Sequence, residues 1–140
     1  MKSLTAILLT SATLLGACAT TGSESPEGTS ISQLRNVEWK IEDIGGQGMI
    51  DDSRATLRFD DEGRVSGHGS CNSLGASYMI HGNEMTISQP VMTLRACAPA
   101  LMDQEGKFVE LLKAVRTYRI DETGALILET TDGKRIVARH

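Results

Sequence analysis

Six consecutive residues, Gly67 to Asn72, constrain the fold of this chain more than any other stretch. They combine two glycines with a cysteine directly after an alternating apolar and polar run. Glycine permits backbone paths that residues with a Cβ atom resist, so the segment is predicted to be a tight turn that follows a strand. A second cysteine, Cys97, lies further along the chain and is a candidate partner for Cys71.

Residues 1–17 are predicted to be a signal peptide. Lys2 supplies a positive start, residues 4–15 are mainly apolar, and the small residues Gly16 and Ala17 precede Cys18. This stretch is too short and too polar for a stable membrane span, but it has the layout of a secretory signal. We therefore expect the chain to leave the cytoplasm.

The end of that signal, Leu15 to Cys18, resembles the lipobox of bacterial lipoproteins. In such signals the peptide is cut before the cysteine, which then carries acyl chains such as palmitate. The resemblance implies a lipidated Cys18, and two or more acyl chains hold a protein firmly on a membrane. Ala19 follows the cysteine, which by resemblance to Gram-negative lipoproteins favours the outer membrane, with the domain in the periplasm. Ordinary cleavage that leaves a spare thiol is the alternative.

Export determines how the other two cysteines are interpreted. In an oxidising compartment Cys71 and Cys97 are predicted to form a disulfide. Zinc or copper ligation together with His68 and His81 is the alternative, but Cys and His metal sites usually show closely spaced pairs, which are missing here. We expect no metal and no cofactor.

Residues 18–33 are predicted to be the lipidated cysteine and a flexible tether, because they are rich in Thr, Ser, Gly and Glu without apolar periodicity. Residues 34–140 are then one domain. The formal net charge of −4 offers no electrostatic reason to bind nucleic acid. A monomer is expected.

Short alternating segments separated by turn residues predict a series of antiparallel hairpins. The predicted strands are 37–41, 55–59, 64–67, 77–80, 84–87, 118–120, 125–128 and 134–138. Before the last three strands, one stripe with helical spacing follows Pro99 and contains Leu101, Glu105, Phe108, Leu112 and Val115. The sequence thus predicts an α+β fold in which an antiparallel sheet packs on one long amphipathic helix. The predicted core face of the sheet is Trp39, Leu57, Phe59, Val65, Tyr78, Ile87, Leu126, Leu128 and Ile136.

Two motifs resemble the signatures of the META/HslJ-like domain, a bacterial envelope family often carried on lipoproteins. The first is Gly67 to Asn72 followed by Gly75 and Tyr78, and the second is Thr93 to Cys97, a threonine ahead of an alanine–cysteine pair. Two departures stand out: Ser70 where many members have glycine, and Leu94-Arg95 where methionine is frequent.

The resemblance spans about residues 34–138 and implies a compact, barrel-like domain with one helix. It also implies a role in envelope maintenance and in heat or antibiotic stress tolerance, and in other lineages in motility or secretion. The signature residues Gly67, Gly69, Asn72, Gly75, Tyr78 and Thr93 are expected to be structural. Asn72 is expected to form the turn through bonds to nearby backbone, and Thr93 to bond backbone beside the disulfide.

Catalytic interpretations of the same residues are weaker. Ser70 with His68 or His81 would give a nucleophile and a base, but the surrounding residues are not a nucleophile elbow and no orienting carboxylate can be identified. A disulfide-bonded Cys71 has no thiolate to offer. The glycines lack the spacing and the lysine of a phosphate-binding loop.

The expected function is therefore that of a non-enzymatic, lipid-anchored envelope protein that binds a protein or a small apolar ligand and supports envelope integrity. An inhibitor-like or secretion-assisting module is the alternative, and a hydrolase is a remote one. The interior of the barrel bears on the choice of ligand: a packed interior favours protein partners, and an apolar pocket favours a lipid-like ligand.

Overall fold

The computed structural model describes residues 31–140. The predicted signal peptide, Cys18 and most of the predicted tether lie outside the described residues. The described part begins with a short helix, α1 (Ile31–Leu34), so the folded part starts before the boundary predicted at Leu34. Trp39 holds this helix in place, because its indole Nε1 donates a hydrogen bond of 2.9 Å to the carbonyl of Leu34.

Ten strands and a second helix follow α1 in the described chain. In chain order they are β1 (Glu38–Ile44), β2 (Gln47–Gly48), β3 (Thr56–Phe59), β4 (Arg64–His68), β5 (Ser73–His81), β6 (Glu84–Ile87), β7 (Val91–Met92), α2 (Pro99–Ala114), β8 (Val115–Ile120), β9 (Leu126–Thr130) and β10 (Arg135–Arg139).

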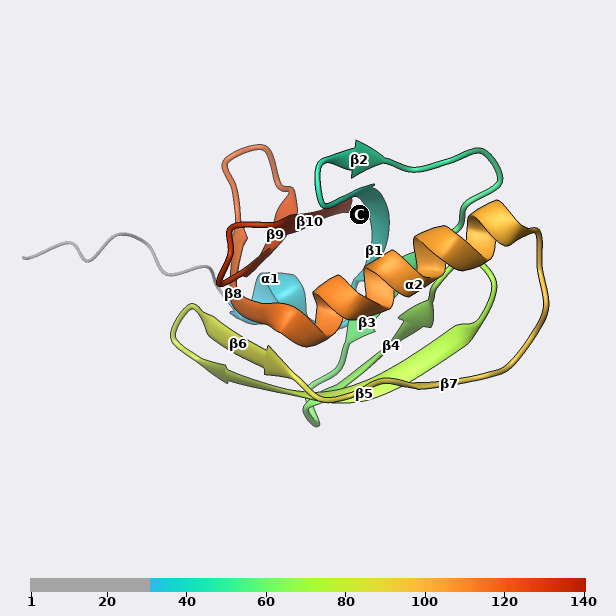
Figure 1. The fold of residues 1–140 in the computed structure, drawn as a ribbon. Coiled ribbons are helices and arrows are strands. Elements are labelled where there is room, and N and C mark those ends of the chain that lie inside the picture. Colours follow the sequence, from blue (N-terminus) through green and yellow to red (C-terminus); the bar gives the residue numbers. More distant parts are fainter. Residues whose placement is uncertain (1–30) are drawn as a thin grey trace, which may run out of the picture.

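Eight of the strands close into an antiparallel barrel (Figure 1). The order around the barrel is β1, β3, β4, β5, β6, β8, β9 and β10, and β10 pairs with β1 to complete the ring. β2 extends the β1 edge, and β7 pairs with the first part of β5. This arrangement confirms the antiparallel, barrel-like sheet.

Helix α2 lies across the barrel, between the β3 to β6 side and the strands β1, β9 and β10 (Figure 1). The predicted first-turn proline is its first residue, and Phe108 and Leu112 are fully buried on its inner face. All nine residues predicted for the core face of the sheet are buried as well. Aromatic and aliphatic side chains therefore fill the space between the sheet and the helix.

Some segments differ from the prediction. β5 begins at Ser73, four residues before the predicted strand, because residues 73–77 pair along their whole length with β4. Apart from Leu74 these residues are small, so the apolar and polar alternation that predicts a strand is weak there, although the backbone is paired. Helix α2 ends at Ala114, and Val115 already belongs to β8.

Gly67 and Gly75 lie in the paired strands β4 and β5 and provide a matched test of the packing. A Cβ atom at Gly67 would lie 2.0 Å from the carbonyl oxygen of Thr56 on β3, whereas one at Gly75 would meet nothing within 4 Å. We predict that Gly67→Ala lowers the free energy of unfolding by at least about 2 kcal/mol. Gly75→Ala should leave it unchanged or raise it by up to about 1 kcal/mol. Urea denaturation of both variants measures this, and equal effects would contradict the close approach of β3 and β4.

Candidate functional site

Gly69 to Asn72 form the turn that joins β4 to β5, whereas Gly67 and His68, which the sequence placed in the turn, are still paired in β4. The carboxylate of Glu105 on α2 binds this turn from the interior of the domain. Glu105 Oε2 accepts hydrogen bonds from the backbone N–H groups of Cys71 at 3.0 Å and Asn72 at 2.6 Å. Its Oε1 accepts a third, 2.8 Å long, from the Asn72 side-chain amide. Glu105 is 6 % exposed, so these bonds replace the water that a buried carboxylate loses.

The fit of Glu105 into the turn explains one of the signature glycines. A Cβ atom at Gly69 would lie 2.5 Å from Glu105 Oε2, so no larger residue fits while the carboxylate is there. The next residue, Ser70, has φ 93°, a backbone conformation that favours glycine. A glycine, which the resemblance described above implies at this position in many members, would adopt this conformation without strain.

The Asn72 side chain connects the turn to the segment between β7 and α2. Its Oδ1 accepts hydrogen bonds from Thr93 Oγ1 at 2.9 Å and from the backbone N–H of Arg95 at 2.7 Å. Glu105 can only accept and the Arg95 N–H can only donate, so the orientation of the amide is fixed from both sides. Asn72 is therefore a link to a distant segment and not the local turn-former that the sequence suggested.

We call residues 93–98 the Leu94 loop. Cys97 in this loop forms the predicted disulfide with Cys71. Thr93 bonds backbone beside the disulfide, as predicted: its Oγ1 accepts from the N–H of Ser73 at 3.1 Å, and its own N–H donates to the Ser73 carbonyl at 3.1 Å.

Leu94 itself is 100 % exposed, although the residues on both sides of it are hydrogen-bonded to Asn72. Nearby Val91 on β7 is 78 % exposed, and Ala96, Ala98 and Pro99 are exposed too. Arg95 carries the one formal charge between residues 91 and 100. The loop thus presents an apolar side chain on a backbone that is held at several points.

The remaining signature residues lie away from this loop. Tyr78 is buried on β5, where its hydroxyl donates to the Asp60 carbonyl at 2.5 Å and accepts from Arg35 Nε at 2.9 Å. It holds the β3–β4 hairpin against the start of the described chain. Gly75 has open space beside it, and nothing in the structure requires a glycine there.

The residues considered for catalysis or metal binding do not form a shared site around one reacting atom. The Ser70 hydroxyl shares a hydrogen bond of 2.5 Å with the Ser53 hydroxyl, and the Nδ1 of His68 accepts from the backbone N–H of Ser70. His81 lies at the other end of β5. Within residues 31–140, no three Cys, His, Asp or Glu side chains form a cluster that could hold a metal ion.

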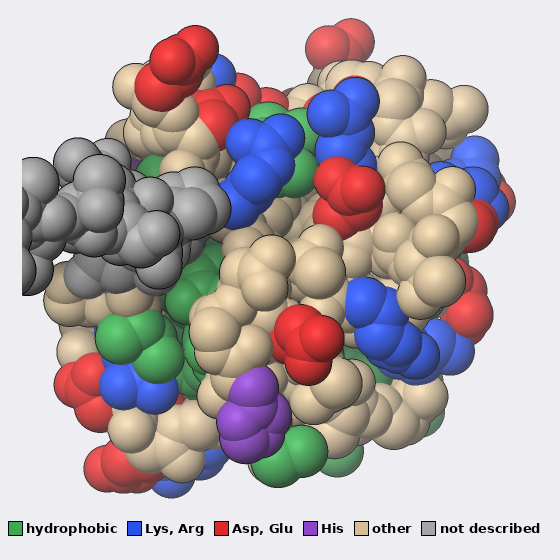
Figure 2. All heavy atoms as spheres, turned by 90° about the vertical axis from the view of Figure 1, so that its left-hand side faces the viewer, with side chains coloured by type: hydrophobic (Ala, Val, Ile, Leu, Met, Phe, Trp, Pro, Cys, Tyr) green, Lys and Arg blue, Asp and Glu red, His purple; other side chains and the backbone are tan. Residues whose placement is uncertain are grey.

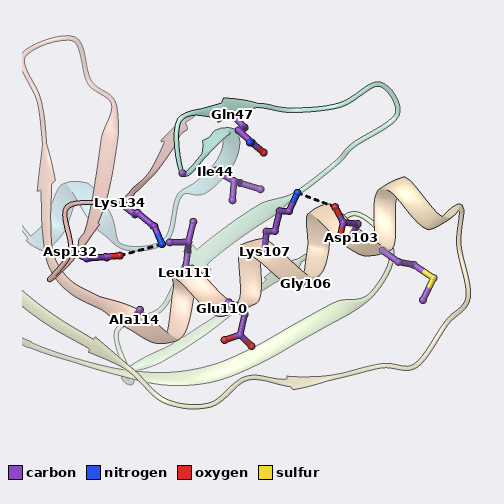
Figure 3. A pocket seen from close by; sticks show the side chains of 12 residues that line it. Ile44, Gln47, Asp103, Gly106, Lys107, Glu110, Leu111, Ala114, Asp132 and Lys134 are labelled. Carbon is purple, nitrogen blue, oxygen red and sulfur yellow. Dashed lines mark ion pairs between the residues drawn. The ribbon is translucent and has the colours of Figure 1, made fainter.

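A surface groove of about 670 Å³ runs along α2 on a different side of the domain (Figure 3). It lies between α2, the β1–β2 hairpin and the β9–β10 turn, and Ile44, Leu111 and Ala114 are among its apolar lining. Two ion pairs stand on its rim, Asp103 with Lys107 at 3.0 Å and Asp132 with Lys134 at 3.2 Å. Hydrogen bonds from the Thr130 hydroxyl and from Lys134 lower the pKa of Asp132.

Charge on the visible surface is mixed. On the face that Figure 2 shows, Lys and Arg side chains alternate with Asp and Glu among small apolar patches. No helix in the described part of the chain is long and apolar enough to cross a membrane.

Comparison with known families identifies the domain. The model of the META domain matches residues 32–140. The chain belongs to the META domain family. The match includes both signature motifs and every strand of the barrel, and no curated protein matches the chain.

Solved structures share the fold at low sequence identity. A protein from Burkholderia xenovorans solved by NMR superimposes with a TM-score of 0.62 at 16 % identity, covering 77 % of this chain and 83 % of its own. A second NMR structure superimposes with a TM-score of 0.58 at 24 % identity, and the match covers 76 % of this chain and 92 % of that one. The crystal structure of a DUF4847 family protein from Bacteroides vulgatus superimposes with a TM-score of 0.56 at 13 % identity, and the match covers 76 % of this chain and 93 % of that one. These similarities show the barrel fold alone.

Glu105, like Asn72, has a role in this site that the sequence did not indicate. We predict that Glu105→Ala lowers the free energy of unfolding by about 2–5 kcal/mol, because two buried backbone N–H groups lose their acceptor. Asp103→Ala, on the same helix, removes only an exposed ion pair and should cost less than about 1 kcal/mol. Thermal and urea unfolding of the two variants measure the difference, and a Glu105→Ala variant as stable as Asp103→Ala would show that the buried bonds contribute little.

Proposed function

We propose that this META domain protein is a non-enzymatic, lipid-anchored component of the cell envelope that binds another protein through the Leu94 loop. The observation that carries the proposal is a fully exposed leucine between two residues that one buried asparagine holds. Single exposed apolar side chains are common on protein surfaces. An apolar side chain on a restrained loop differs from them, because the loop loses little conformational entropy when it binds a partner.

The packing of the barrel supports a protein partner over an enclosed ligand. The side chains between the sheet and α2 are fully buried, among them Trp39 and Phe59 on the sheet and Phe108 and Leu112 on the helix. A small apolar ligand would need space that these side chains occupy. The Leu94 loop instead offers a projecting apolar residue, which fits a pocket on the surface of another protein.

The groove along α2 supports a second candidate function, the binding of a small apolar ligand. Its apolar lining and charged rim suit a ligand with an apolar body and a polar end. It is open along one side, however, and the ion pairs on its rim are exposed, so it provides less burial than a dedicated pocket. We therefore place this function second.

A hydrolase is the remote alternative. The pairing of the Ser70 hydroxyl with Ser53 supports a structural role, since a nucleophile needs a base on its hydroxyl. If any hydrolytic activity is found in the purified protein, it should survive Ser70→Ala.

The anchor is the second part of the proposal. A lipidated Cys18 would tether the domain through residues 19–30 to the periplasmic side of the outer membrane, within reach of envelope proteins. Through its partner the protein would support envelope integrity under heat or antibiotic stress. Mass spectrometry of the protein extracted from membranes should find an acylated Cys18 at its N-terminus, and an unmodified N-terminus would exclude the anchor.

The binding surface is tested by crosslinking in intact envelopes. A photo-crosslinking residue at the exposed position Ala96 should yield one discrete adduct with a protein partner. Leu94→Asp should abolish this adduct, because a carboxylate is costly to bury in an apolar pocket. Met79→Asp, at a position on β5 that is 65 % exposed, is the matched control and should leave the adduct intact. An adduct that persists in Leu94→Asp would show that another surface binds the partner.

A further inference from the structure

We infer that the partner is an endopeptidase with an apolar specificity pocket, and that the Leu94 loop inhibits it as a substrate-like segment. Leu94 occupies the specificity pocket and the Leu94–Arg95 peptide bond lies at the catalytic centre. This inference rests on the proposed function, in which the same loop binds a protein.

The first observation is that the segment around the Leu94–Arg95 peptide bond is exposed and continues from a strand. Thr93 continues the pairing of β7 with β5, because its N–H donates to the Ser73 carbonyl, and Leu94, Arg95 and Ala96 are all exposed. Endopeptidases take their substrates as extended segments, and the pocket for the residue before the cleaved bond sets their specificity. A leucine suits an apolar pocket of this kind.

The second element is the restraint on both sides of the bond. Asn72 Oδ1 accepts from the Thr93 hydroxyl on one side and from the Arg95 N–H on the other. Glu105 fixes the asparagine in turn, through the bond to its amide nitrogen. A flexible substrate loses conformational entropy when it enters a protease, whereas this segment is already ordered, so it binds more tightly at equal contact area.

The third element is what happens after cleavage. Hydrolysis adds one water across the peptide bond and leaves a carboxylate on Leu94 and an amine on Arg95. Cys71 precedes the bond and Cys97 follows it, so the disulfide keeps the two pieces joined. Hydrogen bonds to Asn72 hold both new ends close together, and the high effective concentration favours re-formation of the bond with release of the same water. The products therefore do not leave, and the enzyme stays occupied.

Prolines and the disulfide limit the segment further. Pro90 precedes β7 and is buried, and Pro99 begins α2, so the exposed segment lies between two residues with fixed φ. With Arg95 as its one charge, the segment offers little that an apolar pocket would repel.

Inhibition assays with the full-length protein in detergent test the inference. Chymotrypsin and subtilisin, whose specificity pockets are apolar, should be inhibited by the wild type and equally by Arg95→Gln. Trypsin, whose pocket carries a carboxylate, should not be inhibited by Arg95→Gln, which lacks the exposed arginine that this pocket would accept. Leu94→Lys should weaken the inhibition of chymotrypsin by about 100-fold or more and create inhibition of trypsin. Leu94 is fully exposed, so this variant should fold like the wild type, and only a specificity role predicts that the inhibition changes target. Met79→Lys is the matched control and should inhibit as the wild type does.

Mass spectrometry of the incubated protein provides a second readout. We expect one slow cleavage, between Leu94 and Arg95, that adds one water and separates the pieces only after reduction. Asn72→Ala should be cleaved faster and inhibit less. Absence of inhibition of both apolar-pocket enzymes, or rapid cleavage at other bonds, would overturn the inference. If inhibition fails but the Ala96 adduct still forms and still depends on Leu94, protein binding through the Leu94 loop stands and only the endopeptidase inference is lost. If the adduct is independent of Leu94, the proposed function and the endopeptidase inference both fail.

Discussion

The contact on which the rest of the site depends is the one between the Glu105 carboxylate and the turn at Cys71 and Asn72. A buried carboxylate is unfavourable unless hydrogen bonds replace its water, and here three donors of the turn do so. The same bonds satisfy backbone N–H groups that the turn leaves without a strand partner. One side chain from α2 therefore fixes where the helix crosses the barrel and what shape the β4–β5 turn takes.

A chain of hydrogen bonds runs from the Glu105 carboxylate through the Asn72 side chain to the Leu94 loop. Glu105 accepts from the Asn72 amide nitrogen, and the Asn72 oxygen accepts from Thr93 and Arg95. An aspartate at position 72 would place two carboxylates against each other, and no other residue of this size carries a donor and an acceptor on two separate side-chain atoms. The disulfide adds a covalent link between the same two segments. Leu94 is exposed at the end of this chain of contacts, which is why we assign binding to it.

Much of the fold could be predicted from the sequence, because strand alternation, hairpin turns and helical spacing are local patterns. The core residues of the sheet followed from the alternation, and the disulfide followed from the compartment. The roles of Glu105 and Asn72 could not be predicted from the sequence, because each depends on contacts between residues more than twenty positions apart. Glu105 sat in an otherwise apolar helical stripe, and a charge at such a position was the available signal. The signal peptide and lipidated Cys18 stay predictions outside the described residues.

The central claim is that Asn72, held by Glu105, keeps the backbone around Leu94 ordered while its side chain is exposed. The most direct measurement is the backbone amide order parameter of Leu94 and Arg95 by NMR relaxation, in the wild type and in Glu105→Gln. Glutamine can still accept from the turn, but its NH₂ group would face the Asn72 amide nitrogen. The account predicts wild-type values of about 0.85, as in rigid backbone, and lower values in the variant with the barrel unchanged. Wild-type values below about 0.6 at Leu94 would contradict it.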